Sequence, residues 1–394
     1  MNLRSLFLQY NAQTSEAPIA LPITRAEGVH LYDDTGKAYI DLIGGISVCN
    51  LGHGHPAIRA AIHEQVDRYM HVMVYGELVQ SPQVLYAQAL CEQLPASLQS
   101  VFFTNSGTEA TEGAMKLAKR VTGRYRFVSF KNSYHGSTQG ALSVMGDPYW
   151  QDAFRPLLPG IDQFDYGSYD ALNAITSETA AVIIEPVQSE SGVTVPDTAW
   201  LQAIRTRCTH TGTLLIFDEI QSGFGRTGSL FRFQAINVIP DVLLLGKALG
   251  GGMPLGAFIA SREHMHTLTH TPVLGHISTF GGHPVSCAAG HAALKELLRA
   301  ELIGDVASKS NLLAELLQHP RIKKIQRCGL LMALHFDSYE QNKRLIDRAL
   351  EHGVFTDWFL FASNALRIAP PLTISGNEIR EACNILQRCF NEEV

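Results

Sequence analysis

Residues 214–228 read LLIFDEIQSGFGRTG, a segment that joins an apolar run to an acidic pair and a glycine-rich turn. The apolar run, with its branched and aromatic side chains, predicts a buried strand. The last six residues fit the G-x-G-x-x-G pattern of a dinucleotide-binding turn, which follows such a strand. Asp218 and Glu219 stand between these two features, so either the glycines or the acids can be the functional signal.

Four further apolar runs accompany this one, and helical patterns separate them. This alternation is typical of a parallel α/β fold. In such a sheet, ligands bind outside the carboxyl ends of the strands, so the residues after each run are candidates for a site. The predicted strands are SVFFTN (100–105), YRFVSF (125–130), AAVIIEP (180–186), TLLIFDE (213–219) and DVLLLGK (241–247).

Residues of catalytic and binding types lie at or just after the ends of all five predicted strands. We expect them to converge on one edge of the sheet. Ionised groups are costly to bury without partners, so their presence there indicates function more than structure. These residues are Ser106-Gly107-Thr108, Tyr134-His135-Gly136, Glu185, Asp218 and Lys247.

The turn at Ser106 opens a predicted helix. Ser106 and Glu109 have the spacing of a capping box. Gly107 lets the backbone approach a ligand, and the free N–H groups of a helix start attract anions such as phosphate. The alternative is a well-capped helix without a ligand. No G-K-[ST] sequence occurs, so the turn is not a Walker loop.

Lys247 ends an apolar strand and precedes three glycines, in LLLGKALGGGMPLGA. Desolvation would lower its pKa and free the neutral amine to attack a substrate carbonyl or the aldehyde of pyridoxal phosphate. The alternative is a surface lysine. Pyridoxal phosphate needs a lysine, an acid for its ring nitrogen, an anion site and a flat group against its ring. Lys247, Asp218, the 106–108 turn and Tyr134 supply these four parts.

Composition narrows the classes of partner. The 394 residues are 46% hydrophobic and carry a net charge of −6, without a basic stripe, so neither nucleic acid nor an anionic membrane is an expected partner. No apolar run reaches the length of a membrane span, and the first residues lack the features of a signal peptide. Seven scattered cysteines without C-x-x-C indicate a reduced, cytoplasmic chain. LGHGHP at 51–56 looks like a turn, and no metal site is expected.

The motifs together resemble those of the class III, or ω-amino-group, aminotransferases, the family of acetylornithine, ornithine and 4-aminobutyrate aminotransferases. The resemblance runs from 31–48 to 367–373. It rests on these segments, in the family's order: LGHGHP, TNSGTEATEGAMKLAKR, YHGST, IIEPVQSESG, FDEIQSGFGRTG, LGKALGGGMPLGA and STFGGHP.

The resemblance implies fold type I of the pyridoxal-phosphate transferases, which has a large domain with a mainly parallel central sheet and a smaller C-terminal α/β domain. We expect an N-terminal segment at 1–44 that packs with the small domain, a large domain at 45–285 and the small domain at 286–394. The helical pattern at 288–298 is the expected connector.

The resemblance also implies a role for each site residue. Lys247 is the residue that binds the cofactor aldehyde and then moves the substrate proton. Asp218 pairs with the ring nitrogen. The family's gate glutamate corresponds to Glu190, and its carboxylate-binding arginine to Arg367. Further implied cofactor contacts are Ser106, Gly107, Thr108, Tyr134, His135, Glu185, Gln221 and, from a neighbouring subunit of a homodimer, Thr279.

The implied reaction is a ping-pong transfer of an amino group from an ω-amino donor to 2-oxoglutarate, which gives glutamate. One departure bears on the donor. Acylornithine enzymes typically have an arginine two places after the histidine of the YHGS loop, where this chain has Ser137, and a serine cannot make the charged fork of an arginine. Lys131 and Arg155 lie nearby in sequence but cannot be placed from it. A second departure, QSESG at 188–192 where the family often has QGEGG, retains Glu190.

Three alternatives stay open at this point. An aminomutase of the glutamate-semialdehyde type would use the same cofactor and isomerise its substrate without 2-oxoglutarate. An NAD-dependent oxidoreductase would use GFGRTG, but the following segment has no clean helical stripe, and the next predicted strand ends in Lys247 where the fingerprint needs an acid. A non-catalytic relative would not need Lys247, Asp218 and Gln221 together.

Overall fold

The chain is organised around a seven-stranded sheet in strand order β4-β10-β9-β8-β7-β5-β6. The computed structural model describes residues 3–75 and 78–392. Strands β5 to β9 run parallel, and β10 is antiparallel to both β4 and β9, so the sheet is mainly parallel as the fold class requires. The strands are β4 (Ser100–Thr104), β5 (Arg126–Phe130), β6 (Ile161–Phe164), β7 (Thr179–Ile184), β8 (Leu214–Asp218), β9 (Val242–Leu245) and β10 (Gly256–Ala260).

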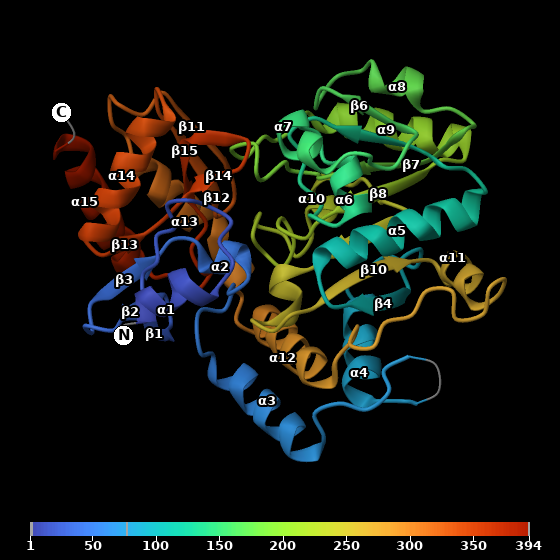
Figure 1. Cartoon of the computed structure of the whole chain (residues 1–394), viewed down its shortest axis with the longest axis horizontal. Helices are drawn as coiled ribbons and strands as arrows, with labels where there is room; N and C mark the ends of the chain where they lie inside the picture. The colour runs from blue at the N-terminus through green and yellow to red at the C-terminus, as the bar shows by residue number, and fades with distance from the viewer. Residues whose placement is uncertain (1–2, 76–77, 393–394) are drawn as a thin grey trace.

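Two four-stranded sheets lie beside the large one, on the left in Figure 1. One is antiparallel, in the order β11-β12-β15-β14. The other joins three N-terminal strands to a strand from the last part of the chain, since β13 pairs in parallel with β3. Their members are β1 (Ile23–Glu27), β2 (His30–Asp33), β3 (Ala38–Asp41), β11 (Lys324–Cys328), β12 (Leu331–His335), β13 (Val354–Phe355), β14 (Trp358–Phe359) and β15 (Ala362–Ile368).

Helices cover these sheets and line the base of the molecule in Figure 1, where α3, α4 and α12 lie together. Helix α12 includes the expected connector at 288–298. The helices are α1 (Leu3–Tyr10), α2 (Gly44–Ser47), α3 (Pro56–Arg68), α4 (Ser81–Cys91), α5 (Gly107–Thr122), α6 (Gln139–Val144), α7 (Pro148–Gln151), α8 (Ala171–Ala174), α9 (Thr198–Thr211), α10 (Arg232–Ile236), α11 (Arg262–His266), α12 (Pro284–Arg299), α13 (Leu302–Leu316), α14 (Tyr339–Glu351) and α15 (Gly376–Glu392).

Strand β8 shows why the apolar runs form this sheet. Its residues alternate between two cores: Leu214 and Ile216 pack in the core with α5, and Leu215 and Phe217 in the core with α9. Because both faces are buried, the strand reads as a continuous apolar run and not as alternating polar and apolar residues. The same burial holds β9 in the centre of the sheet.

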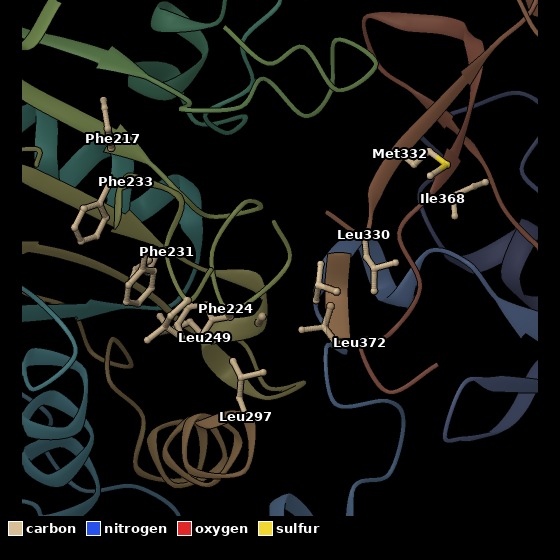
Figure 2. Close-up of a cluster of buried hydrophobic side chains, with 14 of the residues drawn as sticks. Phe217, Phe224, Phe231, Phe233, Leu249, Leu297, Leu330, Met332, Ile368 and Leu372 are labelled. Carbon is tan, nitrogen blue, oxygen red and sulfur yellow. The ribbon is translucent and has the colours of Figure 1, made fainter. Parts of the chain in front are cut away.

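The second of these cores continues from the large sheet into the smaller antiparallel one. Figure 2 shows members from both sides of the junction, with Phe217 and Leu249 from the large sheet's side and Met332 and Ile368 from β12 and β15. The division of the chain at 44 and 285 remains a prediction, and residues 1, 2, 393 and 394 of its terminal segments lie outside the described residues. Within the described part of the chain, none of the helices has the length and apolar character needed to cross a membrane.

Candidate active site

The carboxyl ends of the parallel strands meet at a cavity of about 300 Å³. Strand-end and loop residues that the sequence singled out gather there from positions far apart in the chain. The lining consists of Ser106, Gly107, Thr108, Tyr134, His135, Gly136, Ser137, Glu185, Glu190, Asp218, Ile220, Gln221 and Lys247.

Lys247 follows β9 with a backbone φ of +48°, in the left-handed region that side chains rarely adopt. Its Nζ donates a 2.6 Å hydrogen bond to Oε1 of Gln221. Burial lowers the pKa of Lys247, although the nearby Glu190 and Asp218 act in the opposite direction. A lowered pKa makes the neutral amine more available as a nucleophile and as a proton acceptor.

Asp218 is buried at the end of β8. Its Oδ2 lies 2.7 Å from Nδ1 of His135, and its Oδ1 accepts a hydrogen bond from the amide of Ile220 at 3.0 Å. The carboxylate is therefore fixed on both sides. Sequence reasoning placed His135 in the site without finding this contact, which joins residues 83 positions apart.

Glu219 has a different role from its neighbour. Its carboxylate accepts hydrogen bonds from the amides of Arg232 and Phe233 at 2.6 and 2.7 Å, and so caps the start of α10. It is fully buried, and burial raises its pKa to about 7. Of the acidic pair in the opening segment, one residue lines the cavity and the other stabilises the next helix.

The glycine-rich turn leaves the cavity, and no residue from 222 to 228 is among those that line it. Beyond Gln221 it packs toward the smaller antiparallel sheet. Arg226 is fully buried there and donates to the carbonyl oxygens of Leu330 and Pro370 and to Oδ1 of Asn50. The turn is followed by the five-residue helix α10, which the third glycine does not open, so its geometry differs from a dinucleotide-binding turn.

The start of α5 forms another wall of the cavity. Oγ of Ser106 accepts from the amide of Glu109 at 3.4 Å, as a capping box requires. The reciprocal bond differs from the expectation: Oε2 of Glu109 accepts from the amide of Asn105, 2.8 Å away, because Asn105 also offers its side-chain Nδ2. The amides of Gly107 and Thr108 belong to the first turn, where N–H groups have no partner within a helix.

Glycines at three positions allow close packing around this wall. A Cβ on Gly107 would lie 2.7 Å from Cδ1 of Ile220, and a Cβ on Gly246 would lie 3.1 Å from its Cγ2. A Cβ on Gly136 would lie 2.2 Å from Oγ1 of Thr108. Ile220 was not predicted as a site residue, since an apolar residue between Asp218 and Gln221 gives no chemical signal.

Glu185 and Tyr134 form the side of the cavity at the ends of β7 and β5. The Glu185 carboxylate accepts from the amides of Tyr134 and Ser189 at 3.0 and 3.1 Å. Burial raises the pKa of Glu185 to about 7, and the Asp218 carboxylate contributes to the same rise. The Tyr134 hydroxyl lies 3.1 Å from Oγ of Ser137.

The Glu190 carboxylate binds the guanidinium of Arg367 in a two-pronged contact, with 2.6 and 2.9 Å between the paired atoms. Both side chains are buried. Burial is the largest single influence and would raise the pKa of Glu190, but the charge and hydrogen bonds of Arg367, with the charge of Lys247 and the Leu360 amide, together lower that pKa. Glu190 comes from the loop after β7 and Arg367 from β15, so the pair joins the large sheet to a smaller one.

Arg367 is not among the lining residues and meets the cavity through Glu190. Three further candidates lie outside the cavity. Thr279 is exposed in a separate hollow with His71, whose Nε2 lies 2.9 Å from the Thr279 carbonyl oxygen. Lys131 pairs with Asp165 and Arg155 with Asp152, all at exposed positions. None of the described His, Cys, Asp and Glu residues forms a group of three that could hold a metal.

Comparison with known proteins agrees with this geometry. The model of the family "Aminotransferase class-III" matches residues 11–390. The acetylornithine aminotransferase of Methanopyrus kandleri is 39% identical over 388 residues, which cover 97% of each chain. The putrescine aminotransferase of Pectobacterium atrosepticum is 37% identical, over 92% of this chain and 82% of its own.

Solved structures of transaminases have the same fold as this chain. The ornithine aminotransferase of Toxoplasma gondii superposes with a TM-score of 0.91 at 30% identity, over 98% of this chain and 93% of its own. The omega transaminase of Pseudomonas jessenii in complex with PMP has a TM-score of 0.92 at 26% identity, over 100% of this chain and 98% of its own. The fold is therefore fold type I of the pyridoxal-phosphate transferases.

The chain belongs to the class III aminotransferases and is a pyridoxal-phosphate-dependent transaminase. This excludes the NAD-dependent reading of GFGRTG. The cavity fits the cofactor on observations of its own. Two buried nitrogen atoms that have no partner in the structure, Nε2 of His135 and Nε2 of Gln221, belong to residues that line it. Gly107 and Gly136 let Ile220 and Thr108 pack closely around the start of α5, whose first amides favour a phosphate.

Proposed function

We propose that this transaminase moves the terminal amino group of an ornithine-like or other ω-amino donor to 2-oxoglutarate by a ping-pong mechanism. The observation that carries the proposal is that Lys247, Asp218 and Glu190 line one cavity, with Arg367 paired to Glu190. Pyridoxal phosphate, when bound, supplies an electron sink for the bond broken at the amine-bearing carbon. The residues supply positioning, charge and proton transfer.

Lys247 would bind the cofactor aldehyde through Nζ and, once displaced by the donor amine, move a proton from the amine-bearing carbon. Its lowered pKa supports both tasks, because the amine must be neutral to accept that proton. Asp218 would hold its negative charge against the protonated ring nitrogen, and the contact with His135 keeps the carboxylate in orientation. Gln221 would leave Lys247 and bond the ring hydroxyl.

The remaining cofactor contacts follow from their places on the wall. Ser106, Gly107 and Thr108 would bind the phosphate at the start of α5. Tyr134 would lie against the ring. Glu185, with its pKa near 7, would sit beside the cofactor as a carboxyl able to hold a proton at neutral pH.

The Glu190–Arg367 pair would discriminate between the two substrates of a ping-pong reaction. Arg367 would bind a carboxylate of 2-oxoglutarate when Glu190 moves aside, and stay paired with Glu190 when the donor has no carboxylate there. Ser137 favours donors other than N-acylornithine, because its hydroxyl offers no charged fork and lies beside the Tyr134 hydroxyl.

We also propose a homodimer in which Thr279 of the partner subunit reaches the phosphate. Exposed apolar side chains surround Thr279 in its hollow, and a contiguous exposed apolar patch marks an interaction surface. They include Met73, Leu274, Ile277 and, nearby in sequence, Phe280. All seven cysteines are free, and five are buried, which supports a reducing compartment such as the cytoplasm.

The test is a donor panel assayed with 2-oxoglutarate on the holoenzyme: ornithine, N-acetylornithine, 4-aminobutyrate, lysine and diamines. We expect glutamate to form with an ω-amino donor other than N-acetylornithine. Isomerisation of a substrate without consumption of 2-oxoglutarate would show an aminomutase instead. As a readout independent of turnover, borohydride should attach the cofactor to Lys247, detected by peptide mass.

A further inference from the structure

The guanidinium of Arg367 has a second set of partners besides Glu190. Its Nε donates to Oδ1 of Asp357 at 2.8 Å, and its Nη2 donates to the carbonyl oxygen of Trp358 at 2.8 Å. The ring of Phe359 lies against the guanidinium, with 4.5 Å from the ring centroid to Cζ. Glu190 therefore binds only the Nη1 and Nη2 atoms of the guanidinium, whereas the Nε edge and one face of the group have other partners.

Strand pairing explains why Asp357 stands at this place. Residues 358–359 form β14, which pairs with β15 in an antiparallel hairpin. The amide of Arg367 donates to the Asp357 carbonyl oxygen at 2.9 Å, and Oγ1 of Thr356 donates to the Arg367 carbonyl oxygen at 2.6 Å. These contacts fix the two side chains as neighbours. Asp357 is not among the residues that line the cavity.

Glu190 is held less firmly than Arg367. Apart from the guanidinium, its carboxylate accepts one further hydrogen bond, from the amide of Leu360 at 3.2 Å. Glu190 lines the cavity, so it has space to move into. If the pair separates, the Glu190 carboxylate keeps one weak partner, whereas the Arg367 guanidinium keeps Asp357 and Trp358.

The charges also favour Glu190 as the partner that moves. A buried cation without a partner is strongly destabilising. Because Asp357 stays at Nε, Arg367 remains neutralised while Glu190 is absent. The Nη1 and Nη2 atoms are then available to a substrate carboxylate. Because Arg367 does not need to be repositioned first, the free-energy cost of binding that carboxylate is lower.

We propose that Asp357 is a positioning residue that holds Arg367 in place while Glu190 exchanges with a substrate carboxylate. The inference rests on the proposed function, in which Arg367 binds 2-oxoglutarate. In this proposal Arg367 stays fixed and Glu190 moves.

The experiment measures binding of glutarate, a dicarboxylate without a keto group, to the holoenzyme by calorimetry, together with KM and kcat for 2-oxoglutarate and for a diamine donor. Asp357→Ala removes the acceptor at Nε, and Asp357→Asn retains an oxygen there. Loss of a hydrogen bond to a charged group predicts glutarate binding that is weaker by about tenfold or more in Asp357→Ala. The KM for 2-oxoglutarate should rise similarly, whereas kcat and the KM for the diamine stay unchanged.

Two variants serve as controls. Asp357→Asn should give a glutarate affinity between those of Asp357→Ala and wild type, because its amide oxygen still accepts from Nε but carries no charge. Asp337→Ala removes an exposed carboxylate that pairs with Lys323, and should have no effect. Should Asp357→Ala fold poorly, Asp357→Leu gives the same comparison with a side chain of similar shape.

Wild-type glutarate affinity in Asp357→Ala or Asp357→Leu would overturn the proposal, as would an equal loss for the diamine. Arg367→Ala separates this failure from failure of the proposed function. If Arg367→Ala binds glutarate like wild type, Arg367 is not the carboxylate site and both ideas fail. If only the Asp357 variants bind normally, the carboxylate site stands and Asp357 does not position it.

Discussion

The cavity has two halves that are built in different ways. Asp218 ends β8, and Gln221 and Lys247 follow β8 and β9, which are neighbouring strands of one sheet, so their relative positions are fixed by strand pairing. Glu190 lies in a loop after the large sheet and Arg367 in a strand of a smaller one, and the two meet through one ion pair. The first half can serve every substrate alike, whereas the second can change partners without disturbing the first.

Replacement of Lys247 gives the severest test of the first half. Lys247→Ala should reduce both half-reactions by on the order of 10⁴-fold or more, because it removes the nucleophile and the proton-transfer group together. Single-turnover measurements with a donor alone and with 2-oxoglutarate alone would show this. Turnover near that of wild type would break the comparison, and the exposed Lys323→Ala is the control.

Asp218→Asn should lower kcat for all donors by about 10²–10³-fold, since it removes a preorganised charge and keeps the shape of the side chain. The loss should be equal for donors with and without a carboxylate, since this half is common to all substrates. Steady-state kinetics across the donor panel measures it. A loss confined to one donor would place Asp218 in the discriminating half instead.

Arg367→Ala should raise the KM for 2-oxoglutarate by roughly 10–100-fold, the effect of removing one partner of a charged, hydrogen-bonded contact. The half-reaction of a diamine donor should change much less. Comparing the two half-reactions at the same cofactor content tests the independence of the second half. Equal damage to both would mean that the ion pair also supports the first half.

Glu219→Gln tests the difference between two adjacent acids of the first half. Asp218 lines the cavity, whereas Glu219 caps α10. Its folded-state pKa of about 7 lies above the ordinary value of 4.5, so the folded protein holds this proton more tightly than the unfolded chain. The stability from Glu219 is present below pH 4.5 and is lost as pH rises to about 7. Relative to wild type, Glu219→Gln should gain on the order of 3 kcal/mol between pH 5 and 8.

Unfolding in urea at pH 5 and pH 8 measures this difference, and kcat should stay within about twofold of wild type because Glu219 lies outside the cavity. The subtraction cancels Glu185, which titrates in both proteins. A pH-independent difference in stability, or a large loss of kcat, would contradict the assignment.

The sequence predicted five of the seven strands of the large sheet, each within one or two residues of its observed limits. Four of them, β5, β7, β8 and β9, are buried along almost their whole length and therefore read as continuous apolar runs. Two strands of the same sheet were missed. IDQF in β6 is half-buried at the sheet edge and carries two polar residues, and GAFIA in β10 follows glycines that read as a loop.

Prediction of the site succeeded where residues follow strand ends and failed where pairing joins distant segments. Lys247 and Asp218 could be placed because parallel strands end at one edge. The contact of Asp357 with Arg367 depends on the register of a hairpin, which two short strands do not reveal in sequence. The buried contacts of Arg226 were not predicted either, because Arg226 lies within a glycine pattern that is typical of dinucleotide-binding turns.

Ile220 couples the substitutions that can be accepted at two glycines of the site. The same side chain touches Gly107, beside the expected phosphate, and Gly246, beside Lys247. A larger residue at either glycine would push the same methyl groups, so substitutions at the three positions are not independent of one another. Among relatives we expect these positions to vary together, with a smaller residue at 220 wherever either glycine is replaced.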